Sequence, residues 1–299
     1  YRDNMPIEMF REWCEFLGKY RLGVKNIGHE YVSHKEENGE LKVDLSALHQ
    51  TVEPVAPKYF SPLSMSVFRV PSSVSLGKAD AEKGPAEHAR LVAAYAKEWE
   101  RQKLPGQLHV YGYDEPSAKD YPFLAEGYRR IHESAPGYPI MQTIGDPNPR
   151  QLAGLVDIWC PLTPALTSDF YRERLAAGDT LWAYTCCSPK PPYANFFIDQ
   201  PATDHRLLFW QLRQAGATGF LYWCVCYWDG LPNVASGKPC FPEVPIHLKD
   251  LGTYNSFKDN GDGMLIYPGS ERKPWPSIRL ECLRDGIEQP EHRVAAGKP

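Results

Sequence analysis

The sequence lacks most of the signatures from which a function is usually read. No uninterrupted apolar stretch approaches the roughly 20 residues that a membrane-spanning helix needs, so we expect no membrane span. There is no basic run and the formal net charge is −4, which argues against nucleic acid as the main partner. No glycine-rich phosphate loop follows an apolar stretch, which weakens a dinucleotide-binding interpretation.

Motifs for metal and redox chemistry are also missing. The 8 cysteines form no CxxC pair, and no histidine stands at zinc-finger spacing. Neither an HExxH motif nor a Ser/His/Asp order stands out. Most of the cysteines lie in apolar stretches, where a thiol behaves as a small hydrophobic side chain. We therefore expect neither a metal nor a cofactor.

The 299 residues, of which 42% are hydrophobic, are enough for one large domain with a substantial core. The sequence opens at Tyr1, directly before a predicted helix, and we recognise no signal peptide in it. We expect a chain that is truncated at its N-terminus. The compartment therefore stays open, with a secreted or periplasmic location among the options, and so does the oligomeric state.

Apolar stretches alternate with helical periodicity along most of the chain. The expected helices are 6–20, 44–55, 85–100, 117–134, 149–153, 168–177, 204–215 and 276–287. The expected strands are 22–28, 65–70, 108–113, 139–144, 156–160, 180–185, 219–225 and 264–267, and polar turns or loops are expected at 36–40 and 188–201.

Most of these strands are almost continuously apolar, which is typical of strands that are buried on both faces of a parallel sheet. About seven strands fit this pattern, against the eight of a closed barrel, and the missing one would precede the first helix. The sequence therefore predicts an α/β fold, a (β/α)8 TIM-like barrel without its first strand. An open doubly wound sheet is the alternative. Residues 1–288 are expected to form the barrel and residues 289–299 a polar tail.

The most informative stretch is 108–116, in which an apolar, aromatic run ends in two adjacent carboxylates, Asp114 and Glu115. Proline cannot donate to a sheet ladder, so Pro116 marks the place where the strand stops. The acids are expected at the carboxyl end of a strand, where α/β proteins gather ligands and chemistry. Adjacent residues of a regular strand point to opposite faces, so both acids face one cleft only if the strand ends or bulges there.

Two interpretations of this pair stay open. Two carboxylates in one site do not ionise equally easily, which provides one acid and one anion, as glycoside hydrolysis requires. Alternatively, the pair is a solvated strand end that caps the helix beginning near Ser117, since aspartate is a common N-cap residue.

Aromatic residues gather at the predicted carboxyl ends of the strands and in the loops that follow. Aromatic faces with polar tips suit sugar rings, which present apolar C–H patches and many hydroxyls. A single aromatic residue is more often a core residue, but a collection at one rim favours a sugar site. The residues concerned are Tyr111, Tyr113, Trp159, Trp182, Tyr184, Tyr193, Tyr222, Trp223, Tyr227 and Trp228.

Several segments together resemble glycoside hydrolase family 123 and its uncharacterised relatives. These segments are 111–116, 182–187, 191–195, 222–223 with 227–228, 261–269 and 276–287. The resemblance extends over most of the chain, from about Tyr1 to Glu288. The segment 276–287 is its most specific part, whereas the Asp-Glu pair is short. The β-sandwich that usually precedes the barrel in this family is not recognised in the sequence.

The resemblance implies a (β/α)-barrel and a retaining β-N-acetylgalactosaminidase that acts on a carbohydrate substrate. In that mechanism the 2-acetamido oxygen of the substrate attacks the anomeric carbon, so no enzyme nucleophile is needed. Carried over to this sequence, Asp114 would orient the acetamido group, and Glu115 would protonate the leaving oxygen and then activate water. The other residues that we expect to bind substrate are Tyr113, Trp159, Tyr184, Asn195, Trp223 and Trp228, with Asn195 as a hydroxyl contact.

Three functions are weighed on this basis. The first is a retaining hydrolase of terminal β-linked N-acetylhexosamine, with N-acetylgalactosamine favoured. The second is a carbohydrate-binding, catalytically lapsed member of the same fold. The third is a glycosidase of different sugar specificity that pairs one of the two acids with a distant one. The intact Asp114–Glu115 pair favours the first.

Overall fold

The structure is a computed structural model that describes residues 7–23, 33–52, 64–69, 78–104, 107–227, 261–268 and 273–295. It divides into two compact units. The first comprises Tyr1–Pro161 and Thr167–Trp182, and the second comprises Leu162–Leu166 and Ala183–Pro299. Most of the predicted strand 22–28, as well as Trp228, lies outside the described residues. The assignment of 1–288 to one barrel domain and of 289–299 to a tail stays a prediction.

The first unit contains most of the predicted alternation of strands and helices. Its elements are α1 (Ile7–Lys19), β1 (Ser33–Glu37), β2 (Glu40–Asp44), α2 (Ser46–Val52), β3 (Ser64–Arg69), α4 (Lys78–Gln102), β4 (Gln107–Tyr111), η2 (Ala118–Asp120), α5 (Tyr121–Ser134), β5 (Ile140–Ile144), η3 (Arg150–Leu152), β6 (Ile158–Pro161), α6 (Asp169–Ala176) and the first half of β7 (Thr180–Thr185).

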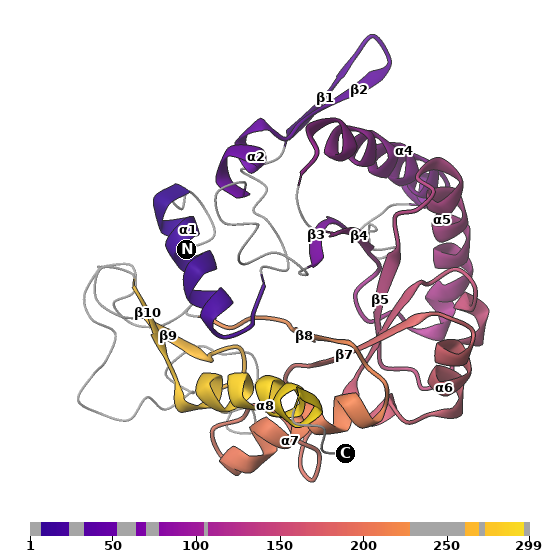
Figure 1. The fold of residues 1–299 in the computed structure, drawn as a ribbon. Helices are drawn as coiled ribbons and strands as arrows, with labels where there is room; N and C mark the ends of the chain where they lie inside the picture. The colour runs from indigo at the N-terminus through magenta and orange to yellow at the C-terminus, as the bar shows by residue number, and fades with distance from the viewer. Residues whose placement is uncertain are drawn as a thin grey trace. The chain divides into compact units, whose positions relative to one another are not determined.

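A parallel sheet organises this unit. Its hydrogen-bonded order is β3-β4-β5-β6-β7, and each neighbouring pair is parallel. Every residue of β5 and of β6 is buried, as their mostly apolar sequences predict. In Figure 1 the helices α4, α5 and α6 lie on the outer side of the curled strands. The predicted α/β class with a parallel sheet is confirmed, whereas a complete (β/α)8 barrel stays a prediction.

The helices cover the sheet with the apolar stripes that the sequence predicts. Val92, Tyr95 and Trp99 of α4 are buried, and α4 packs against α5, whose Leu124 and Ile131 are also buried. These positions recur at helical spacing, so one face of each helix is removed from water. The burial of that face gives most of the stability of such helices.

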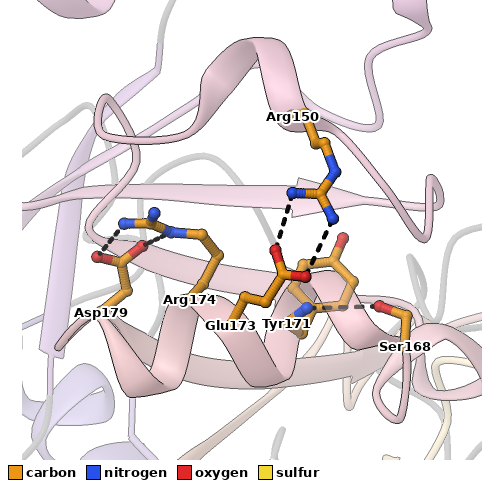
Figure 2. Close-up of polar contacts among 6 residues, drawn as sticks. All are labelled: Arg150, Ser168, Tyr171, Glu173, Arg174 and Asp179. Atoms are coloured by element: carbon orange, nitrogen blue, oxygen red, sulfur yellow. Dashed lines mark hydrogen bonds and ion pairs between the residues drawn. The ribbon is translucent and has the colours of Figure 1, made fainter.

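Helix α6 is fixed by polar contacts at its ends and on its exposed face (Figure 2). Ser168 Oγ accepts the Tyr171 N–H at 3.5 Å as an N-cap. Arg174 binds Asp179 through Nε at 2.7 Å and Nη2 at 3.0 Å, just before β7 begins. Arg150 makes a similar two-point contact with Glu173 on the exposed surface, where solvent screens the ion pair and leaves it little net effect on stability. These contacts fix the direction in which the chain enters β7.

The second unit consists of the remaining elements, with β8 next to β7 in the hydrogen-bonded order. These elements are η4 (Thr163–Ala165), the second half of β7, α7 (Ala202–Gln214), β8 (Gly219–Tyr222), β9 (Ile266–Pro268), β10 (Pro274–Pro276) and α8 (Ile278–Ala295). Helices α7 and α8 pack against each other. Gly286 permits this close approach, because a Cβ there would lie 2.8 Å from Phe209 Cδ2 and 3.0 Å from Arg206 O.

Several boundaries differ from the sequence prediction, and three of them show how. The predicted polar turn at 36–40 belongs to a hairpin, in which Asn38 and Gly39 adopt φ angles of 53° and 80° between the charged strands β1 and β2. Helix α4 begins at Lys78 and contains Pro85, which the sequence places at the helix start. Helix α8 extends to Ala295, eight residues past the predicted end at Ile287. The sequence does not predict β1 and β2, because their residues are too polar to show the apolar alternation of a strand.

No helix among the described residues is long and apolar enough to cross a membrane. Their seven cysteines form no disulfide bond with one another.

The burial of His88 in α4 predicts a loss of stability at acid pH. Burial lowers the pKa of His88 from 6.5 to about 4, so the fold keeps this imidazole neutral while the unfolded chain binds a proton below pH 6.5. Stability from this group is therefore complete above pH 6.5 and falls by up to about 3 kcal/mol as the pH drops to 4. We expect urea unfolding of the wild-type chain to show this fall and His88→Leu to lack it. If the free energies of unfolding of the two proteins changed with pH in the same way, the attribution of this effect to His88 would be wrong.

Candidate active site

Strand β4 ends at Tyr111, shortly before the two predicted catalytic carboxylates. Gly112 still donates its backbone N–H to Met141 O of β5 at 2.7 Å, so the ladder stops just before the pair. Asp114 and Glu115 then occupy a bend, and both side chains are exposed. The pair therefore lies beyond the carboxyl end of a strand in a parallel sheet, where α/β enzymes place their catalytic groups.

The backbone leaves strand geometry at Glu115, which adopts a φ of 52°. Positive φ is uncommon for a residue with a Cβ and persists only where the surroundings impose it. The alternation of strand faces therefore does not apply to Asp114 and Glu115. This removes the geometric objection to both acids facing one ligand.

Two buried hydroxyl groups orient the carboxylate of Asp114. Tyr111 OH of β4 donates to Asp114 Oδ1 at 2.8 Å, and Thr143 Oγ1 of β5 donates to the same oxygen at 3.2 Å. Tyr111 and Thr143 are each 1% exposed. Burial, and then the charge of Asp114, raise the pKa of Tyr111, so its hydroxyl remains a donor at neutral pH. Both bonds go to Oδ1, which leaves Oδ2 of this exposed side chain to a ligand.

A second pair of buried side chains holds the backbone just before the carboxylates. Tyr128 of α5 donates to Gln142 Oε1 and accepts the Tyr113 N–H at 3.2 Å. Gln142 Nε2 in turn donates to Tyr113 O at 2.5 Å. Only glycine fits at position 112, because a Cβ on Gly112 would meet the Tyr128 hydroxyl and lie 2.5 Å from Gln142 Oε1 and 2.9 Å from Met141 O.

The sequence leaves open whether Asp114 or Glu115 caps the helix that follows. In the structure Asp120 closes this turn instead. Ser117 donates its backbone N–H to Asp120 Oδ2 at 3.0 Å and its hydroxyl to the same oxygen at 2.8 Å. This contact closes the turn at η2, whereas the Asp114 carboxylate bonds back to the sheet. Asp114 is therefore not the cap of the following helix.

Trp159 lies in the core and not at the strand tip. It is 1% exposed, and its ring packs edge-to-face against Phe170 and Tyr171 of α6 at centroid distances of 5.1 and 6.0 Å. Its Nε1 donates to Asp179 Oδ2 at 2.7 Å. The ring has no face left for a sugar, so we do not retain Trp159 as a substrate contact. Tyr113, next to Asp114, is partly exposed.

Asn195 organises a loop of the second unit. Its Nδ2 donates to Cys186 O at 2.9 Å and to Pro189 O at 3.0 Å, and its Oδ1 accepts the Phe196 N–H at 2.8 Å. The residue is 0% exposed. Both amide hydrogens are used within the protein, so the geometry does not support a contact with a sugar hydroxyl. Tyr184, at the end of β7, is also buried.

Trp223 follows β8 and is partly exposed, as a wall of a sugar site requires. Its Nε1 donates to Asp262 Oδ1 at 3.0 Å. The predicted partner Trp228 lies outside the described residues. Asp262 is therefore a buried acceptor for a predicted substrate contact, and the sequence alone does not single it out.

The predicted site residues are divided between the two units. Asp114, Glu115 and Tyr113 belong to the first unit, whereas Tyr184 and Trp223 belong to the second. Their gathering into one pocket stays a prediction. Among the described residues, no group of three or more His, Cys, Asp or Glu side chains could hold a metal ion.

Comparison with known proteins identifies the class and the family. The family model described as the catalytic domain of glycoside hydrolase 123 matches residues 92–293, about two thirds of the chain. The chain therefore belongs to glycoside hydrolase family 123. A search of curated proteins gives no match.

One solved structure shares the fold of this chain. The structure of a family 123 glycoside hydrolase from Clostridium perfringens, described for its hydrolysis of glycolipid glycans, matches with a TM-score of 0.64 at 15% identity. The match covers 97% of this chain and 55% of that one, so this chain spans about half of the related protein. A thermostable mutant of a xylanase, Xyn10A from Cellvibrio japonicus, matches at a TM-score of 0.45 and 11% identity, over 83% of this chain and 84% of that chain.

The crowding at Gly112 predicts a local and measurable cost. Gly112→Ala should lower the free energy of unfolding by about 1–3 kcal/mol, because the new methyl group must displace the backbone of β5 or the Tyr128–Gln142 contact. Gly145→Ala, at the end of β5, is the matched control, since a Cβ there meets no atom within 4 Å. If urea unfolding gave equal midpoints for the two variants, the proposed crowding at position 112 would be refuted.

Proposed function

We propose that the chain cleaves terminal β-linked N-acetylhexosamine, with N-acetylgalactosamine favoured, and retains the configuration at the anomeric carbon. The observation that carries this proposal is the Asp114 carboxylate, held through Oδ1 by Tyr111 and Thr143 beside the exposed Glu115. Membership of family 123 supplies the reaction class, glycoside hydrolysis. The sugar and the mechanism are inferred from the chemistry of the two acids.

In the first step the acetamido group of the substrate acts as the nucleophile. Its carbonyl oxygen bonds to the anomeric carbon while the bond to the leaving oxygen breaks, which gives an oxazolinium-type intermediate. Positive charge develops on the acetamido nitrogen, so a carboxylate that accepts its N–H stabilises the transition state more than the ground state. Asp114 suits this role because its Oδ1 is already held and its Oδ2 is available.

Glu115 suits the role of general acid and base. In the first step its proton moves to the leaving oxygen, and in the second its carboxylate takes a proton from the water that attacks the anomeric carbon. The acetamido oxygen leaves that carbon in the second step, so the product keeps the configuration of the substrate. The exposure of Glu115 leaves its carboxyl group accessible to the leaving oxygen in the first step and to the attacking water in the second.

This mechanism explains why two neighbouring acids are sufficient. A retaining enzyme with its own nucleophile places two carboxyl groups about 5 Å apart across the scissile bond. When the substrate supplies the nucleophile, the second carboxylate is needed beside the acetamido group and not beneath the anomeric carbon. Asp114 and Glu115, joined by a backbone that turns at φ 52°, match this requirement.

The two acids should respond differently to the leaving group. Glu115→Gln should lower kcat/KM by about 10²–10⁴-fold on a β-N-acetylgalactosaminide with an alkyl aglycone, and far less with a nitrophenyl aglycone that leaves without protonation. Asp114→Asn should lower turnover of both substrates severely, because stabilisation of the oxazolinium charge does not depend on the aglycone. Steady-state kinetics on the two substrates measures the difference.

Glu133→Gln, an exposed carboxylate on α5, is the control and should leave both rates unchanged. Full turnover in both Asp114→Asn and Glu115→Gln would exclude the proposed site. Binding of N-acetylgalactosamine by calorimetry without turnover of either substrate by the wild-type chain would instead establish the catalytically lapsed alternative.

A further inference from the structure

The second unit contains a buried carboxylate that the proposed mechanism does not use. Asp262 is 8% exposed and lies in the turn 261–263. Its Oδ1 accepts a hydrogen bond from Tyr222 OH at 2.9 Å and another from Trp223 Nε1 at 3.0 Å. Both donors come from the end of β8, so this one oxygen fixes two consecutive aromatic side chains.

The Tyr222 hydroxyl is itself fixed from the other side. The Gly263 N–H donates to Tyr222 OH at 2.8 Å, while that hydroxyl donates to Asp262. Burial raises the pKa of Tyr222 well above its ordinary value, so the hydroxyl keeps its proton. The ring packs edge-to-face on Phe196 at a centroid distance of 5.3 Å. Tyr222 therefore serves as a support that sets the position of the Asp262 carboxylate.

Packing also restricts the Trp223 ring. Gly263 has a φ of 71°, and a Cβ on it would lie 2.5 Å from Trp223 Cζ2 and 3.0 Å from Cη2. The ring of Tyr227 packs against Trp223 at a centroid distance of 5.0 Å with an interplanar angle of 54°. The indole is thus held at its nitrogen by Asp262 and along its six-membered ring by Gly263.

Stability alone gives no reason for a carboxylate at this position. Burial raises the pKa of Asp262 above its ordinary value, and the hydrogen bonds from Trp223 and Tyr222 offset only part of that effect. Apolar side chains of similar size often fill such places at least as stably as buried charges. A carboxylate does, however, give a stronger and more directional hydrogen bond to an indole N–H than a neutral acceptor does. Its benefit is therefore the orientation of Trp223.

We propose that Asp262 is a positioning residue that holds the indole of Trp223 at one angle, so that its partly exposed face forms a platform for the apolar face of the sugar. This inference rests on the proposed function, because it takes Trp223 as a substrate contact. A preorganised aromatic platform binds a sugar without losing side-chain entropy on binding. Asp262 acts through Trp223 and makes no contact with the reacting atoms.

The test combines substrate kinetics with an observation of the indole itself. In Asp262→Asn the Trp223 Nε1–H should move toward the chemical shift and exchange rate of a solvent-exposed indole, as seen in ¹H–¹⁵N spectra assigned with Trp223→Phe. KM for a nitrophenyl β-N-acetylgalactosaminide should rise about tenfold, whereas kcat should change less than about threefold. A general loss of structure would lower kcat and the melting temperature together and would not give this split.

Two further variants make the result decisive. Asp285→Asn, a partly exposed carboxylate on α8 of the same unit, should change neither the indole signal nor KM. Tyr222→Phe removes one support of Asp262 and should shift the same indole signal, so it replaces Asp262→Asn if that variant fails to fold. A folded Asp262→Asn or Tyr222→Phe with unchanged Trp223 signal and unchanged KM would overturn the inference.

Failure of the proposed function can be distinguished from failure of this inference. If the wild-type chain turns over no N-acetylhexosaminide, the proposed function fails, yet the indole signal still reports whether Asp262 holds Trp223. In that case calorimetry with N-acetylgalactosamine replaces KM. Weaker binding by Asp262→Asn would support the positioning role, and equal binding would refute it.

Discussion

The two hydrogen bonds that Asp114 Oδ1 accepts from Tyr111 and Thr143 are the constraint on which the candidate site depends. Both donors are buried and lie on neighbouring strands, so the sheet and not a flexible loop sets the direction of this carboxylate. Without them, an aspartate on an exposed bend would be solvated and free to rotate. A group that is already oriented needs no reorganisation when charge develops in a transition state, and this is the largest advantage that a folded protein has over water.

Each unit supports a candidate site residue in the same way. In the first, the backbone before Asp114 is held by the buried contact between Tyr128 and Gln142. In the second, Asp262 holds the partly exposed Trp223. Each support includes a glycine at which a Cβ would collide with the neighbouring side chain. Buried polar groups that are fully paired rigidify their surroundings, which explains why these polar residues lie beneath the surface and not on it.

The sequence was sufficient for the α/β class, for most element positions and for the place of the two acids, because these follow from apolar periodicity and from the strand-ending proline. It was not sufficient for the direction of individual side chains. Trp159 and Asn195 have the residue types of sugar contacts, but tertiary packing turns one toward α6 and uses the other inside a loop. The supports of Asp114 were missed for a related reason: Thr143 and Gln142 lie on another strand, and no local pattern reveals which residues neighbouring strands bring together. Asp262 has the local sequence of a turn, and only its contact with β8 reveals its role.

A crystal structure of the chain with the thiazoline analogue of N-acetylgalactosamine tests the central claim most directly, because this ligand mimics the cyclised intermediate. We expect Asp114 Oδ2 within hydrogen-bond distance of the thiazoline nitrogen, with Oδ1 still bonded to Tyr111 and Thr143, and Glu115 facing the anomeric carbon of the same sugar. A complex in which Asp114 turns away from the ring nitrogen, or in which the analogue binds apart from Glu115, would contradict it.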